Sequence, residues 1–400
     1  MKPGTPGFRG SRLIEAREAR GLSGIALADL VGVTRGAITQ YEKDDQTPRP
    51  EVMQRISEKL NLPVAFFLRE MQPQPQRVMY YRSLAAATKG VRRQAERRHE
   101  WLRDIAAWLS GMVDFPKLNF PDFSPPDDPA LISRERIENS ARRARRYWSL
   151  GDGPISSVVW HLENCGAIVS LSDFGSEDLD AFSDTAAGKF EPFVSVSVDK
   201  TIAARSNFTA AHELGHLLLH KNIPPNVAKR PAEHKLIEQQ ANQFADAFLL
   251  PESTFYLQVR RPSLDLFRAL KPQWRVSIGA MIMRSKSLEL INDEQYRKLW
   301  VAYSARGWKH GEPYDDELTH TGPRVLRRAF ELILNEGIVS RDEILSALPF
   351  AATDIERLCG LDAGFLSNDY ATNMVRLPPR SAMETKRRSG VAEVLPFNRK

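Results

Sequence analysis

The chain has 400 residues, of which 42% are hydrophobic and 26% are charged, with 56 Lys and Arg against 50 Asp and Glu. These values are typical of a soluble globular protein and exclude a disordered chain, and no apolar run approaches the roughly 18 residues that a membrane span needs. The length exceeds what one hydrophobic core usually organises, so two or three domains are expected. The first ten residues lack the apolar core of a signal peptide, and two cysteines are too few for a disulfide framework. The sequence therefore predicts a cytoplasmic protein.

Residues 9–70 are predicted to form a domain of five helices. At its centre is the sequence IALADLVGVTRGAITQYE (25–42), in which an apolar-faced helix leads to Gly32 at a tight turn. A second helix follows, with Thr34 as its N-cap. This is the helix-turn-helix geometry, in which the second helix can lie in the major groove of DNA. The spacing resembles that of the Cro/CI-type (XRE) DNA-binding domain.

The resemblance implies which residues would contact DNA. They lie at the start and on the exposed face of the second helix, at Thr34, Arg35, Thr39 and Gln40. Arg35 and Gln40 could hydrogen-bond base edges, whereas Gly36 has no side chain to reach them. Pairing of two copies would match the two half-sites of an operator, so a homodimer is one expected assembly. Because residues 9–69 hold ten Lys and Arg against eight Asp and Glu, a domain that docks a protein partner in place of DNA is the alternative.

Residues 71–150 are predicted to be a linker and a basic helical segment. The linker is MQPQPQ (71–76), because proline deprives a helix of a donor. Residues 77–103 carry eight Lys and Arg against two Glu, and residues 134–146 carry six Arg against two Glu. Such runs bind phosphates or acidic partners, or form solvated helix faces. An aromatic and apolar stripe at helical spacing predicts an amphipathic helix that faces a core; it consists of Trp101, Ile105, Trp108 and Met112.

The pattern changes in residues 151–313, which are predicted to form an α+β domain. GAIVSL (166–171) and FVSVSV (193–198) have the β-branched composition of strands, and two long helices follow around 206–220 and 233–249. Residues 314–370 are predicted to be a helical C-terminal region, and residues 371–400 a flexible tail. The expected fold class is therefore α+β and mostly helical, with a small sheet in the central domain.

The sequence FTAAHELGHLLLH (208–220) predicts a metal site. On a helix, His212 and His216 leave the same face about 6 Å apart in rise, a spacing that can grip one zinc ion. Glu213 is turned aside from that pair, where it could take a proton from a water activated by the metal. The helix is otherwise apolar, so histidines without a ligand would be an unexplained polar intrusion. His220 is about 12 Å from His212 along the axis, too far to bind the same ion, and is expected in the core or beside a ligand.

The next predicted helix offers a third ligand. In EQQANQFADAFLLP (238–251), Glu238 stands one turn before Asn242, so Glu238 could bind the metal while Asn242 hydrogen-bonds a ligand histidine. Glu238 taken alone could equally be an acid favoured by the helix dipole. A histidine pair on one helix and a glutamate on the next is the gluzincin layout.

Together, RSNFTAAHELGHLLLH, EQQANQFADAFLLP, DLDAFS (178–183) and the strand upstream resemble the ImmA/IrrE family of zinc metallopeptidases. The resemblance implies a zincin-like central domain in which His212, His216 and Glu238 bind Zn²⁺ and Glu213 is the general base. It further implies cleavage of a partner repressor or antitoxin that controls gene expression.

Two alternatives keep the same domains and change their roles. In one, the chain is a transcription factor whose zincin-like domain senses a signal without turnover. In the other, it is a protease that uses its helix-turn-helix domain to dock a protein. An oxyanion donor is also needed for peptidase chemistry. Arg205 and His234 are candidates by their nearness in the sequence, and either could be structural.

Overall fold

The computed structural model describes residues 4–71, 77–82, 88–172, 181–186, 189–197, 202–318 and 322–367. The described residues form two compact units. The first unit contains the described residues of 1–74, 88–115 and 324–400, and the second those of 75–87 and 116–323. The mostly helical α+β class is confirmed. Residues 72–76 of the predicted linker, part of DLDAFS and the C-terminal tail from residue 371 lie outside the described residues.

The first unit begins with the predicted five helices. These are α1 (Gly10–Ala19), α2 (Gly24–Val31), α3 (Arg35–Glu42), α4 (Pro50–Leu60) and α5 (Val64–Leu68). The turn between α2 and α3 follows the sequence chemistry, because Gly32 adopts a left-handed conformation with φ 73° and the Thr34 hydroxyl accepts a hydrogen bond from the backbone N–H of Ala37. Ala28 and Ile38 are buried between the two helices. The helix-turn-helix geometry is thus present.

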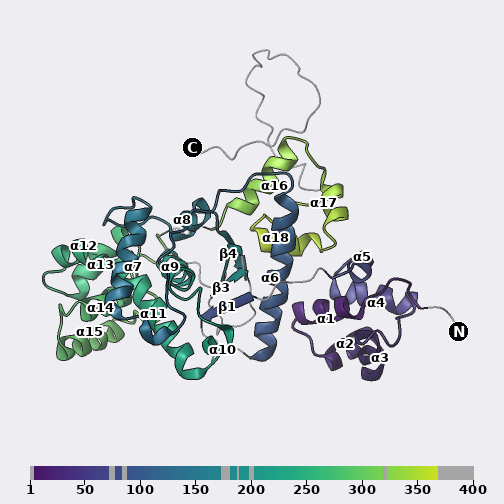
Figure 1. Ribbon diagram of the computed structural model, residues 1–400, viewed down its shortest axis with the longest axis horizontal. Coiled ribbons are helices and arrows are strands. Elements are labelled where there is room, and N and C mark those ends of the chain that lie inside the picture. The colour runs from purple at the N-terminus through teal and green to yellow at the C-terminus, as the bar shows by residue number, and fades with distance from the viewer. Residues whose placement is uncertain are drawn as a thin grey trace, which may run out of the picture. The chain divides into compact units, whose positions relative to one another are not determined.

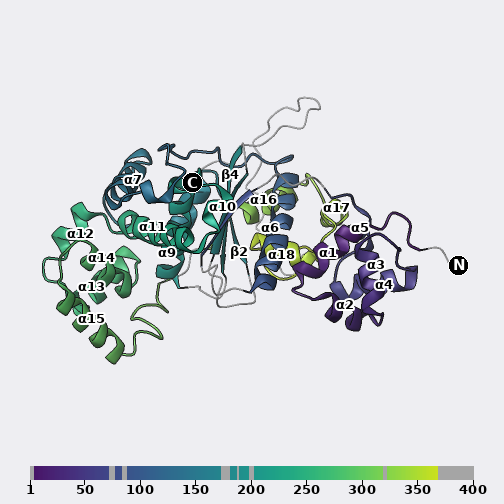
Figure 2. The same cartoon turned by 60° about the horizontal axis from the view of Figure 1, so that its bottom comes forward.

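Four helices from distant parts of the sequence complete this unit. They are α6 (Lys89–Leu109), α16 (Val325–Asn335), α17 (Arg341–Ala347) and α18 (Ala352–Cys359). Figure 2 shows α6 beside α16 and α18, and α6 also contacts α1. The predicted segments 71–150 and 314–370 are therefore not independent of residues 9–70, since parts of both share a core with them.

Trp101 is the centre of this shared core. The Trp101 ring is fully buried, and its centroid lies 5.8 Å from that of Phe66 and 5.2 Å from that of Phe350. Its indole N–H donates to the Glu15 carboxylate at 2.7 Å. The predicted stripe on α6 thus faces a core. The basic run of α6 also contributes to packing, because Arg97 forms an ion pair with Glu18 of α1 at 2.8 Å.

The second unit contains a four-stranded sheet with the order β1-β3-β4-β2. Its strands are β1 (Arg77–Arg82), β2 (Ile168–Ser172), β3 (Ala181–Ala186) and β4 (Lys189–Ser197). β2 and β4 are parallel, whereas β3 pairs antiparallel with both β4 and β1. The predicted strands correspond to β2 and β4. β1 lies in the segment that was predicted to be basic and helical, so that expectation was wrong for residues 77–82.

Helices of the second unit surround two long central ones, α9 (Ala203–Leu219) and α11 (Pro231–Leu249), which lie side by side in Figure 1. The others are η1 (Pro129–Leu131), α7 (Arg134–Tyr147), α8 (Val158–Asn164), α10 (Pro225–Ala228), α12 (Glu252–Gln258), α13 (Leu264–Trp274), α14 (Ile278–Ser287) and α15 (Asp293–Ala305).

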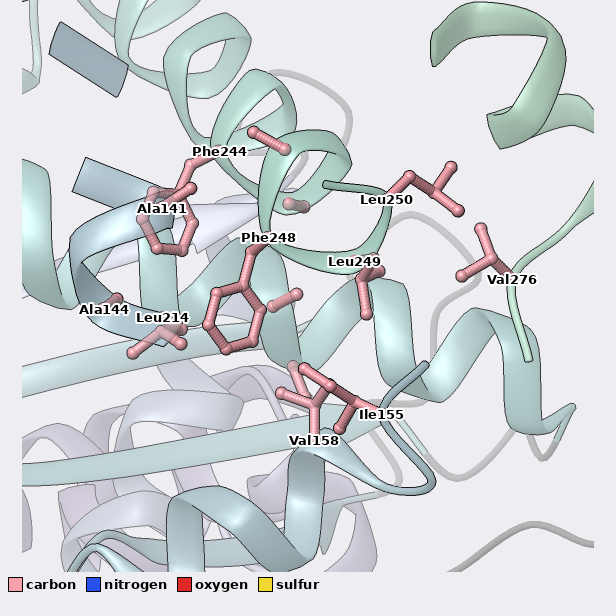
Figure 3. Close-up of a cluster of buried hydrophobic side chains, with 14 of the residues drawn as sticks. Ala141, Ala144, Ile155, Val158, Leu214, Phe244, Phe248, Leu249, Leu250 and Val276 are labelled. Carbon is pink, nitrogen blue, oxygen red and sulfur yellow. The ribbon is translucent and has the colours of Figure 1, made fainter. Parts of the chain in front are cut away.

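The core of the second unit lies where α7, α9 and α11 meet. Figure 3 shows Phe244 and Phe248 of α11 near Leu214 of α9 and Ala141 of α7. The two phenyl rings stack with centroids 5.7 Å apart. Burial of each such side chain stabilises the folded protein by roughly 1.5–3 kcal/mol. This core fixes the spacing of the two helices that carry the predicted metal ligands.

Candidate metal centre

α9 places the two motif histidines in the interior. Alanine and leucine make up about half of the helix, and His212 and His216 are fully buried on it. As the spacing of four residues predicts, the imidazoles point to one place, with their Nε2 atoms 3.0 Å apart. At most one hydrogen fits between these two nitrogens. The pair therefore presents at least one lone pair to the same point.

α11 brings Glu238 to that point. Its carboxylate oxygens lie 3.3 Å from the Nε2 atoms of both histidines. Gly215 permits the approach, because a Cβ atom there would meet the Cα of Ala241 and the Cβ of Phe244 at 3.2 Å. The glycine of HELGH thus allows close packing of the two helices, a role that the motif alone does not indicate.

The donor atoms fit a small divalent cation. One atom from each of His212, His216 and Glu238 lies within 4.8 Å of the other two. Tetrahedral zinc with bonds of about 2.0–2.1 Å holds its ligand atoms roughly 3.3 Å apart, close to the separations found here. Burial of Glu238 raises its pKa, but the two adjacent imidazoles outweigh burial and lower it. A charged carboxylate is the form that binds a metal.

A hydrogen-bond chain behind His216 sets the direction of its lone pair. The amide N–H groups of Gln240 donate to the carbonyls of Pro129 and Ile132, at 2.7 and 3.0 Å. Gln240 Oε1 is therefore the acceptor for His220 Nε2, at 3.1 Å. His220 Nδ1 must then accept from His216 Nδ1, at 3.0 Å, which leaves Nε2 of His216 free of hydrogen.

The protonation of His220 agrees with this chain. Its complete burial, and next the neighbouring His216, lower the pKa of His220 well below its ordinary value. A neutral ring with one N–H is what the chain requires. The structure thus places His220 beside a predicted ligand, as expected. Gln240 was missed, because a glutamine on an amphipathic helix carries no metal signal.

Asn242 orients the other histidine. Its Oδ1 lies 2.9 Å from Nδ1 of His212, the contact expected from the sequence. An amide oxygen can accept only, so Nδ1 of His212 carries the hydrogen and Nε2 faces Glu238. The two histidines are thus held in the same tautomer by separate partners.

Three further residues were predicted to take part in catalysis. Glu213 is fully buried next to His212. Arg205 is exposed two turns before His212 on α9, and His234 is partly buried one turn before Glu238 on α11. General-base and oxyanion roles for these three side chains stay predictions.

The face predicted to read DNA is exposed on α3. Arg35, Gly36, Thr39 and Gln40 are all exposed, whereas Ile38 is buried. The Thr39 hydroxyl donates back to the Arg35 carbonyl at 3.1 Å. The Thr34 hydroxyl caps the helix, as its sequence position predicts. Arg35 and Gln40 are therefore the long side chains that this face presents.

Comparison with protein families matches two parts of the chain. Residues 163–286 match the IrrE N-terminal-like domain, and residues 13–67 match the helix-turn-helix family. A search of curated proteins gives no match. Within the described residues, no helix has the length and apolar character to cross a bilayer. The chain therefore joins a DNA-binding domain of the Cro/CI helix-turn-helix type to a domain of the ImmA/IrrE metallopeptidase family.

Proposed function

We propose that this chain is a zinc-dependent endopeptidase of narrow specificity that is linked to a DNA-binding domain. The observation that carries the proposal is the convergence of His212, His216 and Glu238, with donor atoms 3.0 to 3.3 Å apart. Separate hydrogen-bond partners orient both imidazoles for a cation. The match to a peptidase-type family supports hydrolysis over simple metal storage.

When bound, zinc would lower the pKa of a water molecule and polarise a peptide carbonyl. Glu213 would take the proton of the attacking water and pass it to the leaving amine. Asn242 and His220 would hold the imidazoles of His212 and His216 in position throughout.

The fused domains suggest regulation of genes by proteolysis. The substrate would be a partner repressor or antitoxin in the cytoplasm, and Arg35 and Gln40 of α3 would contact the operator. A homodimer would match paired half-sites. These roles rest on the joining of the two family domains in one chain.

Glu213→Gln provides the test of this function. The variant keeps the size of the side chain and all three proposed ligands, so it should bind zinc like the wild type and cleave at least about a thousandfold more slowly. Wild type and variant would be expressed at equal levels in cells that lack the protein, and newly formed protein N-termini would be compared by mass spectrometry. Glu233→Gln on α11 is the charge-matched control.

Loss of specific new N-termini in Glu213→Gln alone would support the peptidase. Identical sets of N-termini in all three strains would contradict it. That result would favour a sensor domain without turnover, a reading to which the complete enclosure of His212, Glu213 and His216 is also suited.

A further inference from the structure

A second polar site lies beside the metal centre in the same unit. It is a cavity of about 460 Å³ lined by parts of α9, α11, α14, α15 and the segment after α15. Asn242, which orients His212, forms part of its wall. Aromatic residues Phe208, Trp300 and Tyr303 line it as well. The volume is typical of a pocket for a small ligand or one side chain.

Asp246 is the unusual member of this lining. It follows Glu238 and Asn242 at intervals of four on α11, so it continues the same face about 12 Å beyond the metal ligand. The side chain is only partly exposed, and its open part belongs to the cavity. Among the described residues, none forms a hydrogen bond or ion pair with its carboxylate.

The nearest cation does not satisfy Asp246. Arg284 acts on it only at longer range, because the Arg284 guanidinium binds both carboxylate oxygens of Glu138 and the carbonyl of Leu250. Burial consequently raises the pKa of Asp246 to about 7. A buried carboxyl without a counter-ion lowers stability, and such groups concentrate at functional sites.

The opposite wall of the cavity is preformed. Glu312 accepts hydrogen bonds from the backbone N–H groups of Ile278 and Gly279, from the Tyr303 hydroxyl and from the buried Lys271, all within 3.0 Å. These bonds fasten the segment after α15 to the start of α14. Trp300 packs against Gly279, where a Cβ atom would lie 3.3 Å from the indole. The wall is therefore held in place before any ligand arrives.

Much of this wall lies outside the part of the chain that matches the family. The IrrE N-terminal-like match ends at residue 286, whereas Trp300, Tyr303 and Glu312 lie beyond it. The cavity thus combines one side taken from the matched helices with a second side supplied by α15 and the segment that follows.

We propose that this cavity, the Asp246 pocket, receives an arginine or lysine side chain of the polypeptide bound at the metal centre. The aromatic walls would cover the aliphatic stem, and the Asp246 carboxylate would pair with the cationic head. Arg205, Lys309 and His310 are also in the lining, but they are exposed, so solvent screens their charges more than that of Asp246. The proposal rests on the proposed peptidase function, since it names the substrate side chain that this site selects.

The test measures binding of two amino-acid probes with blocked, uncharged termini to the full-length chain. Nα-acetyl-arginine methylamide carries the cation, and the citrulline counterpart has nearly the same shape without charge. Ligand-observed NMR titration should show the arginine probe binding at least about tenfold more tightly. Asp246→Asn should abolish that preference, whereas Glu233→Gln, which removes the same charge elsewhere on α11, should keep it.

Equal binding of the two probes to wild type would overturn the proposal, as would undetectable binding of the arginine probe or a preference that survives in Asp246→Asn. Tighter binding of Nα-acetyl-glutamate methylamide would also overturn it, because the exposed cations would then define the pocket. Zinc content, measured on the same samples, reports separately on the proposed peptidase site. A chain without zinc that still prefers the arginine probe would refute the peptidase and leave a cation-binding pocket.

Discussion

The metal centre and the exposed face of α3 differ in how their polar side chains are held. At the metal centre, His212 and His216 are fully buried and each is held by a directed hydrogen bond. On α3, Arg35 and Gln40 are exposed, while the helix is held by its Thr34 cap, its buried face and the ion pair between Glu42 and Arg17. Buried polar groups need hydrogen-bond partners within the protein, whereas exposed ones can hydrogen-bond to water until a ligand binds.

This difference predicts how the two regions respond to mutation. Substitution of a residue that hydrogen-bonds a buried ligand should lower zinc affinity, because no water can replace the lost hydrogen-bond partner. A change on α3 should act locally and should leave the fold intact.

Gln240→Leu should weaken zinc binding about 10- to 100-fold, although Gln240 contacts no ligand directly. Without the Gln240 oxygen, nothing fixes the hydrogen of His220 on Nε2, so His216 loses its assigned tautomer. Competition with a chromophoric chelator at several pH values measures the affinity.

Gln243→Leu, on the partly buried position three residues later, is the matched control and should bind zinc like the wild type. Gln240→Glu, which can still accept from His220, should recover part of the affinity. An equal loss of zinc affinity in all three variants would mean that α11 tolerates substitution poorly, and it would contradict a specific role of Gln240 in orienting His216.

Arg35→Ala should weaken operator binding by about 1–3 kcal/mol and leave zinc binding unchanged. Its side chain is exposed and its removal exposes no buried group. Electrophoretic mobility shift at several salt concentrations, with the promoter of the chain's own gene, measures both affinity and salt slope. Arg97→Ala is a useful comparison, because that arginine packs α6 against α1 and should reduce stability more than DNA affinity. Unchanged DNA binding by Arg35→Ala would favour a protein-docking role for the domain.

Asp246→Asn should raise thermal stability at pH 8 by on the order of 1 kcal/mol. Burial raises the pKa of Asp246 to about 7 in the folded protein, above its value of about 3.9 in the unfolded chain. Between these two values the folded state holds a proton that the unfolded state has lost, so wild-type stability falls as pH rises from about 4 to about 7 and levels off above that. Melting curves should show the advantage of the variant shrinking below pH 6. A variant that is less stable at pH 8 would show that the carboxylate has an internal partner.

Local chemistry made much of the site predictable from the sequence. The spacing of His212, His216 and Glu238 determines which helix faces they occupy, and the Thr34 cap follows from its position before α3. What could not be predicted depends on segments far apart in the chain. The Trp101 ring contacts Phe350, which is almost 250 residues later in the chain. Gln240 orients His220 only because carbonyls from another segment accept its amide hydrogens. Asp246 lines a cavity only because Trp300 on α15 supplies another part of the wall. No local pattern encodes such partners.

The most direct measurement is zinc per chain, by elemental mass spectrometry, in protein purified without chelator, for wild type and Glu238→Ala. We expect about one zinc in the wild type and a sharp loss in the variant, because two histidines alone hold zinc weakly. A folded wild type that contains no zinc and takes up none when it is added would contradict the central claim. His212 and His216 would then be a buried polar pair without a metal, and DNA binding would remain as the function to study.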